Sequence, residues 1–308
     1  MTDDLARAEA SLRAVCGGRL RTGVPLAPLT SFRVGGPAAL YLEPEDDADV
    51  LAAARAVRET GIDVVVLGKG SNVLVADDGF HGLVLRLGRG YRWAARDGDA
   101  LTAGAAMPLP ALAGVALRHG LEGLAFGVAI PGSVGGAVRM NAGAHGTEMA
   151  NLLESVDVLR LGDMRGRTSV AADDISFAYR RSDLPADAVV LAARLRLRAG
   201  DRDAIRRAMD EARAWRRETQ PVAEPNCGSV FKNPAGDHAA RLIDAAGLKG
   251  LTVGTARVSD KHANFIVTVP PARAADVAAL IATIQTRVEA SAGVRLEPEV
   301  RFVGEVAT

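Results

Sequence analysis

The chain has 308 residues, of which 48% are hydrophobic and 24% charged, and its 37 Lys and Arg residues equal its 37 Asp and Glu residues. This composition is typical of a folded globular protein and excludes a disordered or fibrous class. The balanced charge argues against a nucleic-acid or anionic-membrane partner, although a local basic cleft would be compatible with it. The length allows two or three domains with substantial cores.

No stretch approaches the roughly 18 consecutive apolar residues that a membrane span requires, and the first 18 residues lack the basic start and apolar core of a signal peptide. Two cysteines, Cys16 and Cys227, are too few for a disulfide framework or a four-ligand metal site. The five histidines show no ligand spacing. We therefore expect a cytoplasmic monomer with no bound metal and no membrane or nucleic-acid partner.

The first part of the chain predicts a strand, a helix and a strand. The apolar run Ala39–Leu42 leads into acidic residues that suit a helix start, and Val50, Leu51, Ala54 and Val57 then fall on one helical face. The run Val64–Leu67 is typical of a buried strand, and it ends at a glycine-rich turn.

The remainder alternates short apolar runs with helical patterns. We expect a charged helix of about five turns over residues 201–220, bridging into a last domain. Domain boundaries near 85 and 202 divide the chain into 1–85, 86–202 and 203–308. The other expected elements are helices near Leu109–His119, His238–Ala246 and Ala274–Ala292, and strands near Val156–Leu161, Val189–Leu197, Leu251–Val258, Asn264–Val269 and Val294–Val303.

Two glycine-rich turns, Gly68–Asn72 and Ile130–Gly136, stand out as anion-binding candidates. Glycine lets backbone N–H groups converge on an anion, and Lys69, Ser71 and Asn72 add polar groups to the first turn. Neither turn fits the Walker or the Rossmann pattern. Each alone could be an ordinary tight turn, but a third polar turn at Met140–Gly146 follows closely, which favours one extended ligand such as a dinucleotide.

Three further segments concentrate polar groups, and together they supply an arginine, a hydroxyl and a carboxylate: Phe177–Ser182, Asn226–Pro234 and Leu296–Arg301. These groups can stabilise negative charge and move one proton. The alternatives are a surface ion pair for Arg180, a turn hydrogen bond for Ser229 and an outward position on an edge strand for Glu299. For Cys227, a buried inert thiol is favoured over a nucleophile. The residues by themselves thus indicate a dinucleotide-binding α+β enzyme with an anionic substrate.

Seven motifs, in this order, resemble those of the UDP-N-acetylenolpyruvoylglucosamine reductase (MurB) family. They are Thr30–Pro37, Gly68–Asn72, Ile130–Gly136 with Asn141–Gly143, Tyr179–Arg180, Gly228–Pro234, Ser259–Ile266 and Leu296–Arg301.

The resemblance implies an α+β fold of three domains. Two of them, 1–85 and 86–202, would form a non-Rossmann FAD-binding unit of the PCMH/VAO type, and 203–308 would bind substrate and return its last strand toward the FAD cleft. FAD would be held non-covalently, with its diphosphate on the backbone of Gly70–Asn72 and of the 131–136 turn, glycines there being too constrained for a bulky side chain. The cofactor residues would be Gly68, Lys69, Gly70, Ser71, Asn72, Pro131, Gly132, Ser133, Gly135, Gly136, Asn141 and Gly143.

The family's reaction implies roles for further residues. NADPH would reduce FAD, which would pass hydride to the enolpyruvyl group of UDP-N-acetylglucosamine enolpyruvate, giving UDP-N-acetylmuramate for peptidoglycan synthesis. Ser229 would protonate the neighbouring carbon, while Arg180 and Glu299 converge on the enolate-like carboxylate. Tyr179, Lys232 and Asn233 would bind substrate.

One departure concerns the subtype. Only 49 positions separate Arg180 from Ser229, with no tyrosine between them, which is similar to the shorter branch that lacks a tyrosine-bearing loop over the substrate diphosphate. Lys232 and arginines of the 212–217 segment are candidates to replace that contact. Two other functions remain open: a flavin oxidase of the same superfamily, and a non-catalytic nucleotide-sugar sensor.

Overall fold

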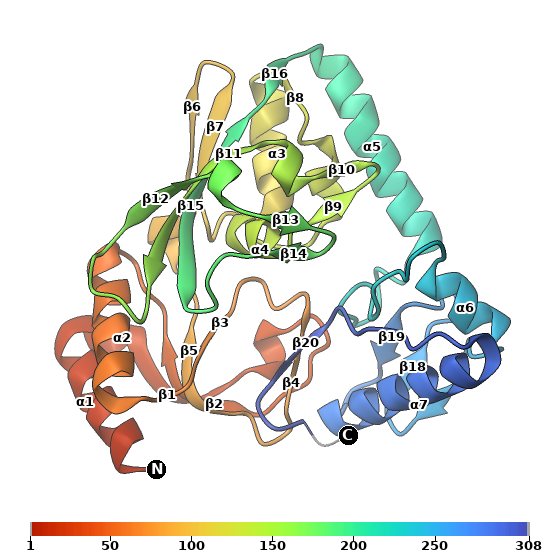
Figure 1. Ribbon diagram of the computed structural model, residues 1–308, viewed down its shortest axis with the longest axis horizontal. Helices are drawn as coiled ribbons and strands as arrows, with labels where there is room; N and C mark the ends of the chain where they lie inside the picture. Colours follow the sequence, from red (N-terminus) through yellow and green to blue (C-terminus); the bar gives the residue numbers. More distant parts are fainter. Residues whose placement is uncertain (1, 307–308) are drawn as a thin grey trace. The chain divides into compact units, whose positions relative to one another are not determined.

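The computed structural model describes residues 2–306 and is an α+β protein, as the sequence predicts (Figure 1). The helices are α1 Asp3–Cys16, α2 Asp47–Thr60, α3 Leu109–Arg118, α4 Val134–Arg139, α5 Arg202–Thr219, α6 Ala239–Ala245 and α7 Ala274–Ala292.

The chain folds into two compact units, each built from separate segments. The first unit comprises the chain up to Thr22, Leu40–Lys69 and Gly82–Trp215. The second comprises Gly23–Ala39, Gly70–His81 and the chain from Arg216 onward. Two short N-terminal segments therefore join the C-terminal third of the chain in one unit. The proposed division at residues 85 and 202 stays a prediction.

An antiparallel five-stranded sheet organises the first unit, in the strand order β12-β11-β15-β7-β6, and its central strands lie side by side in Figure 1. Its long strand β15 contributes an unbroken buried run from Ala188 to Ala193, and α4 packs against it. The bounds are β6 Ala94–Asp97, β7 Ala100–Gly104, β11 Leu153–Arg160, β12 Thr168–Ala171 and β15 Ala188–Arg196.

Shorter strands complete the first two thirds of the chain. Strands β1, β2, β5 and β3 form a four-stranded sheet in that order, in which β3 and β5 are parallel. The bounds are β1 Leu20–Pro25, β2 Pro37–Leu42, β3 Val64–Val66, β5 Phe80–Leu85, β8 Leu121–Glu122, β9 Gly143–Ala144, β10 Thr147–Glu148, β13 Phe177–Ala178, β14 Arg181–Ser182 and β16 Arg198–Ala199.

Local chemistry explains why α2 forms where the sequence predicts it. Asp46 is the N-cap, and its carboxylate accepts a hydrogen bond from the Asp49 N–H at 3.0 Å. This satisfies one of the backbone donors that a helix start leaves unpaired. Val50 and Ala54 are fully buried on the inner face.

In the second unit, the three-stranded meander β17-β18-β19 packs with α7 over a continuous apolar core. That core joins Phe32 and Leu74, from the two N-terminal segments, to Phe231 and Ile281. Strand β4 pairs in parallel with the last strand, β20, as Figure 1 shows. The bounds are β4 Val73–Val75, β17 Thr252–Val253, β18 Ala256–Val258, β19 Ile266–Thr268 and β20 Arg301–Val303.

Two predicted strands are wrong in extent. The segment Leu251–Val258 is a hairpin of two short strands, because the chain turns at Gly254. The expected strand Val294–Val303 is regular only over Arg301–Val303. The Glu297 carbonyl instead accepts the Lys232 N–H, and Pro298 makes a single bridge to Phe231. Glu299 therefore precedes the strand on which the sequence places it.

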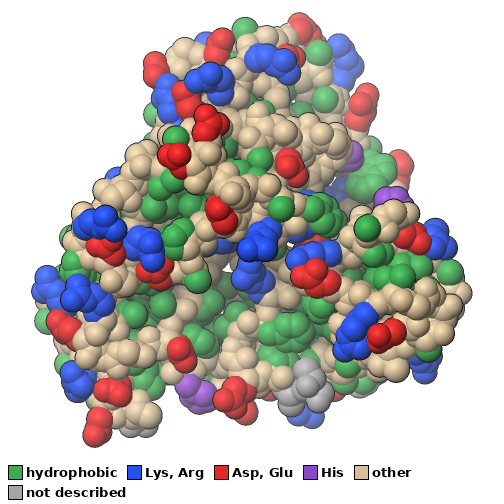
Figure 2. All heavy atoms as spheres, in the orientation of Figure 1, with side chains coloured by type: hydrophobic (Ala, Val, Ile, Leu, Met, Phe, Trp, Pro, Cys, Tyr) green, Lys and Arg blue, Asp and Glu red, His purple; other side chains and the backbone are tan. Residues whose placement is uncertain are grey.

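Acidic and basic side chains are interspersed over the face seen in Figure 2, in keeping with the balanced charge of the sequence. No helix in the part of the chain that the structure describes is long and apolar enough to cross a membrane.

Candidate active site

A solvent-open cavity of about 650 Å³ lies in the first unit, where the first glycine turn follows β3. Gly68 and Lys69 line it together with Ser133, Gly135 and Gly136 of the second glycine turn. Two motifs that lie more than 60 positions apart in the sequence therefore share one cavity.

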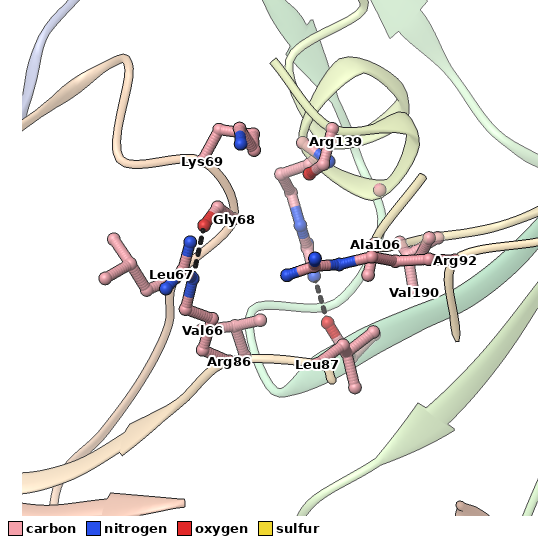
Figure 3. A pocket seen from close by; sticks show the side chains of 15 residues that line it. Val66, Leu67, Gly68, Lys69, Arg86, Leu87, Arg92, Ala106, Arg139 and Val190 are labelled. Carbon is pink, nitrogen blue, oxygen red and sulfur yellow. Dashed lines mark hydrogen bonds between the residues drawn. The ribbon is translucent and has the colours of Figure 1, made fainter. Parts of the chain in front are cut away.

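The cavity combines apolar walls with basic side chains. Lys69, Arg86, Arg92 and Arg139 line it, and no acidic residue does (Figure 3). Its apolar walls come from residues such as Val66, Leu67, Leu87 and Val190, of which the last lies on β15. This arrangement suits a ligand with an apolar body and an anionic part.

Two of the arginines are held by main-chain carbonyls. Arg86 Nε donates to the Gly68 carbonyl at 3.3 Å, and Arg139 donates to the carbonyls of Leu184 at 2.8 Å, Pro185 at 2.9 Å and Ala188. Arg86, Arg92 and Arg139 could not be predicted as site residues, because no sequence motif marks them. Their role in the wall depends on pairing between distant segments.

The second glycine turn is tightly packed at one glycine and open at another. A Cβ added at Gly135 would lie 2.9 Å from the Ala105 Cβ, whereas at Gly132 it would meet only Ile130, at 3.7 Å. The prediction that both glycine turns are too constrained for a bulky side chain is therefore wrong for Gly132 when only contacts within the protein are counted.

Most backbone donors of the second turn are already bonded within the protein. The Val134 and Gly135 N–H groups donate to the carbonyls of Met107 and Ala105, each at 2.9 Å, and the Gly136 N–H donates to Ser133 Oγ at 3.3 Å. Among the described residues, the structure gives no partner to the N–H groups of Gly132 and Ser133. These two are the candidate backbone donors to an anion, because Pro131 has no N–H.

The rest of the first glycine turn, Gly70–Asn72, belongs to the second unit. Gly70 has φ 64°, and a Cβ there would lie 2.1 Å from the Leu29 carbonyl oxygen, so close packing alone requires glycine. The Gly70 carbonyl accepts the Ser31 N–H at 2.9 Å. Asn72 Nδ2 donates to the Glu299 carbonyl at 3.1 Å, and the Asn72 carbonyl accepts the Arg301 N–H.

Asn141 is fully buried, and both ends of its side-chain amide are bonded within the protein. Its Nδ2 donates to the Ala178 carbonyl at 3.1 Å, and its Oδ1 accepts the Ala150 N–H at 3.0 Å. The side chain thus supports the β13–β14 hairpin. Gly143 pairs with Glu148 in the β9–β10 hairpin. Neither residue lines the cavity, and their expected contact with the cofactor stays a prediction.

The β13–β14 hairpin carries Tyr179 and Arg180 at its tip. Arg180 has φ 57°, a conformation that is uncommon for residues other than glycine and that concentrates at functional sites. Its guanidinium carbon lies 4.9 Å from the centroid of the Tyr179 ring, and Tyr179 is 47% exposed. The Ser182 hydroxyl donates to the Arg139 carbonyl at 2.9 Å, which joins the hairpin to the end of α4.

In the second unit, the segments that contain Ser229 and Glu299 pair directly. The Glu299 N–H donates to the Val230 carbonyl at 2.7 Å, one residue after Ser229. Ser229 itself follows a tight turn in which the Gly228 N–H donates to Asn226 Oδ1 at 2.9 Å. The structure therefore brings a hydroxyl and a carboxylate that are 70 positions apart onto adjacent backbone segments.

The expected substrate residues Lys232 and Asn233 are engaged within the second unit. Lys232 Nζ forms an ion pair with Glu297 Oε1 at 2.5 Å, and Asn233 Oδ1 accepts the Ala239 N–H at 3.1 Å at the start of α6. Asn233 therefore has a structural role in this arrangement, and its contact with substrate stays a prediction.

Both thiols are buried, as the sequence favours for Cys227. Burial raises the pKa of the Cys227 thiol far above its ordinary value, and the Glu299 carboxylate adds to the shift. Burial, followed by the nearby Asp49, raises the pKa of Cys16 to about 12. Thiols with such pKa values are poor nucleophiles. Among residues 2–306, no group of three or more His, Cys, Asp or Glu is arranged to hold a metal ion.

Two protein-family profiles match the chain. An FAD binding domain matches residues 38–170, and the C-terminal domain of UDP-N-acetylenolpyruvoylglucosamine reductase matches residues 220–303.

Full-length relatives match almost the whole chain. The UDP-N-acetylenolpyruvoylglucosamine reductase of Heliobacterium modesticaldum is 47% identical over 91% of this chain and 90% of its own length. That of Azorhizobium caulinodans is 42% identical over 98% of this chain and 97% of its own length. The crystal structure of UDP-N-acetylenolpyruvylglucosamine reductase (MurB) from Thermus caldophilus superimposes with a TM-score of 0.80 at 38% identity, covering 92% of this chain and 100% of that one.

Proposed function

The chain belongs to the UDP-N-acetylenolpyruvoylglucosamine reductase family, and we propose on this premise that it reduces the enolpyruvyl ether of UDP-N-acetylglucosamine enolpyruvate. It is an FAD-dependent oxidoreductase that uses NADPH and supplies UDP-N-acetylmuramate for peptidoglycan synthesis. The observation that carries this proposal is the basic, glycine-lined cavity of the first unit. Most of its lining, from Val66 to Arg139, falls within the segment that matches an FAD binding domain.

The cavity has the chemistry that FAD requires. Lys69, Arg86 and Arg92 would neutralise the diphosphate, and the N–H groups of Gly132 and Ser133 would donate to its oxygens. The apolar walls would receive a flat ring system. The close approach of Gly68 to Ser133, whose Oγ an added Cβ would meet at 2.7 Å, supports glycine at this wall. Bound FAD would supply the hydride chemistry, by which reducing equivalents from NADPH reach the methylene carbon of the enolpyruvyl group.

Ser229 donates the proton that completes the reduction. Hydride addition leaves negative charge on the carbon that bears the carboxylate, and a strongly basic centre of this kind can be protonated by a hydroxyl. The hydroxyl proton moves to that carbon, and the alkoxide left on Ser229 regains a proton from solvent. The carbon–carbon double bond becomes a single bond, so that the substrate gains one hydride and one proton.

Arg180 and Glu299 stabilise the charge that accumulates on the substrate carboxylate. Arg180 supplies a permanent cation whose planar fork suits a carboxylate. Glu299 acts as a neutral hydrogen-bond donor, a state that desolvation by bound substrate would favour. These interactions strengthen as charge develops, so they accelerate the reaction rather than only binding substrate.

Substrate recognition is assigned to Tyr179, Lys232 and Asn233. Lys232 would contact the diphosphate in place of the missing tyrosine-bearing loop. We assign FAD binding to residues 1–202 and substrate binding to 203–308. The enzyme acts in the cytoplasm as a monomer, without nucleic-acid or membrane partners.

A two-step spectroscopic experiment tests this function. The purified protein should carry flavin that NADPH bleaches anaerobically and that the UDP-enolpyruvyl sugar restores. Ser229→Ala should keep the first step and slow the second by about 10²-fold or more, the usual contribution of general acid catalysis. Ser229→Cys should keep partial activity. Equal losses in both steps would instead make Ser229 structural.

The same experiment separates the two competing functions. A flavin oxidase would consume oxygen with an alcohol or hydroxy acid and would not need NADPH. A nucleotide-sugar sensor would bind the substrate without restoring the oxidised flavin spectrum.

A further inference from the structure

Asn264 lies in the second unit and is almost completely buried, with 4% of its surface exposed. Its side-chain amide makes two hydrogen bonds to one residue of the Ser229 segment. Oδ1 accepts the Phe231 N–H at 2.9 Å, and Nδ2 donates to the Phe231 carbonyl at 2.8 Å. The Asn264 carbonyl also accepts the Val230 N–H at 2.9 Å. Three hydrogen bonds thus join one residue to the two residues after Ser229.

An amide is suited to this position in a way that other side chains of its size are not. It presents an acceptor and a donor side by side, so it satisfies both backbone groups of Phe231 as a neighbouring strand would. A hydroxyl is too short to reach both, and a carboxylate would leave the Phe231 carbonyl without a donor. Because the pair is buried, an unmade bond there is costly.

The opposite side of the same segment is bonded to the irregular segment that carries Glu299. The Glu299 N–H donates to the Val230 carbonyl at 2.7 Å, and the Lys232 N–H donates to the Glu297 carbonyl at 2.9 Å. The backbone that follows Ser229 is therefore bonded on one side to Asn264 and on the other to the segment that carries Glu299.

We propose that Asn264 is a positioning residue for the proton donor, fixing the Ser229 backbone so that its hydroxyl meets the substrate carbon. This inference rests on the function proposed above. A misplacement of about 1 Å can cost about 10²-fold in rate, so small backbone shifts at Ser229 would slow proton donation.

The test is a double-mutant cycle on the step in which substrate reoxidises reduced flavin. Asn264→Asp keeps the acceptor for the Phe231 N–H and loses only the donor to the Phe231 carbonyl. We expect this variant to slow flavin reoxidation by about 10-fold to 10²-fold and to leave flavin content and flavin reduction by NADPH within about twofold of the wild type. Amide hydrogen exchange at Val230 and Phe231 should accelerate.

The pH dependence of Asn264→Asp adds a readout that general destabilisation would not move. A buried carboxyl has a raised pKa, and its protonated form regains a donor for the Phe231 carbonyl. The reoxidation rate relative to the wild type should therefore rise as the pH falls from about 8 to about 6. The ring of His262, whose Nδ1 accepts the Asn264 N–H at 3.3 Å, is present in both proteins, so the ratio is the quantity to compare.

Thr255→Val is the matched control in the same unit. The Thr255 hydroxyl donates to Asp276 Oδ2 at 2.7 Å and accepts the Arg273 N–H at 3.1 Å. Its loss should lower the melting temperature with no selective change in reoxidation and no rate recovery at low pH. Similar rate effects in Thr255→Val and Asn264→Asp at matched melting temperatures would overturn the inference.

Measuring the effect of Asn264→Asp in a Ser229→Ala variant distinguishes a failure of the positioning role from a failure of the proposed function. If Asn264 acts through Ser229, Asn264→Asp should change the rate of Ser229→Ala by less than about twofold, because groups that act as one unit are not additive. A full additional loss in the double variant would overturn the positioning role and leave the function intact. A Ser229→Ala variant with wild-type reoxidation would refute Ser229 as the donor, and the positioning role with it.

Discussion

Two of the three glycines of the second glycine turn, Gly132 and Gly135, give a sharp prediction, because the structure requires glycine at Gly135 and leaves space at Gly132. An added Cβ at Gly135 would sit 2.9 Å from the Ala105 Cβ, about 0.6 Å closer than the optimal separation of about 3.5 Å for two carbon atoms. Both atoms are fixed to backbone, so relief requires α4 to move. At Gly132 the added Cβ would make an ordinary contact of 3.7 Å with Ile130.

The expected magnitudes follow from these contacts. Overpacking of this kind costs about 1–3 kcal/mol, so Gly135→Ala should lower the free energy of unfolding by that amount. Gly132 has no positive φ, and Gly132→Ala should be neutral or raise it by about 0.4–1 kcal/mol through the unfolded chain. The two substitutions should therefore differ by about 1–4 kcal/mol.

The two substitutions should affect flavin binding and the free energy of unfolding in different ways. Gly135→Ala should lose flavin through displacement of α4. Gly132→Ala should lose flavin at unchanged or greater stability, because its methyl group would occupy space near the N–H groups assigned to the cofactor. The assay is urea unfolding at several FAD concentrations, where bound ligand adds RT ln(1 + [L]/Kd) to the free energy of unfolding. Equal stability of the two variants would refute the packing argument, and full flavin affinity in Gly132→Ala would refute the placement of the diphosphate.

Three further predictions address the rest of the site. Glu299→Gln should keep more activity than Glu299→Ala, because an amide still donates a hydrogen bond; equal rates near wild type would remove the residue from the mechanism. Asn141→Ala should lower the free energy of unfolding by about 1–3 kcal/mol, since it removes two part-buried hydrogen bonds, and should speed hydrogen exchange in the β13–β14 hairpin. Asn151→Ala, which removes an exposed hydrogen bond to the Glu148 N–H, should change both quantities little. Above about pH 9 the Cys227 thiol stays protonated in the folded protein while the same thiol ionises in the unfolded chain. The free energy of unfolding should therefore fall with rising pH less steeply in Cys227→Ala than in the wild type. Identical slopes of unfolding free energy against pH would contradict the raised pKa of Cys227.

The sequence predicts those elements whose signals are local. Helix α7 begins and ends at the predicted residues, Ala274 and Ala292, and α2 and α5 lie where apolar spacing and charge place them. The elements that the sequence predicts wrongly are those whose hydrogen-bond partners lie far away in the chain. Residues 294–300 look like a strand, but their partners are main-chain groups near Lys232, more than 60 positions away, and they bond irregularly.

The site shows the same division. Motif resemblance selects Ser229 and Glu299, whose segments the structure pairs, and Gly68 and Ser133, which it brings to one cavity. It also selects Asn141, whose buried side chain supports a hairpin instead of lining that cavity. The wall arginines and the amide of Asn264 could not be assigned from sequence, because their roles depend on which distant backbone groups lie beside them.

The pairing of β4 with β20 has a consequence for how the protein is made. During synthesis on a ribosome, Val73 cannot pair with Arg301 until that residue has been translated, 228 positions later. At about 5–20 residues per second this delay is about ten to fifty seconds. The first unit can close once Trp215 has emerged, but at that point Phe32 and Leu74 still lack the core partners that the chain from Cys227 onward supplies. The apolar residues of the two early segments therefore stay uncovered after the first unit can fold, and a chaperone that binds exposed apolar chain would find them there.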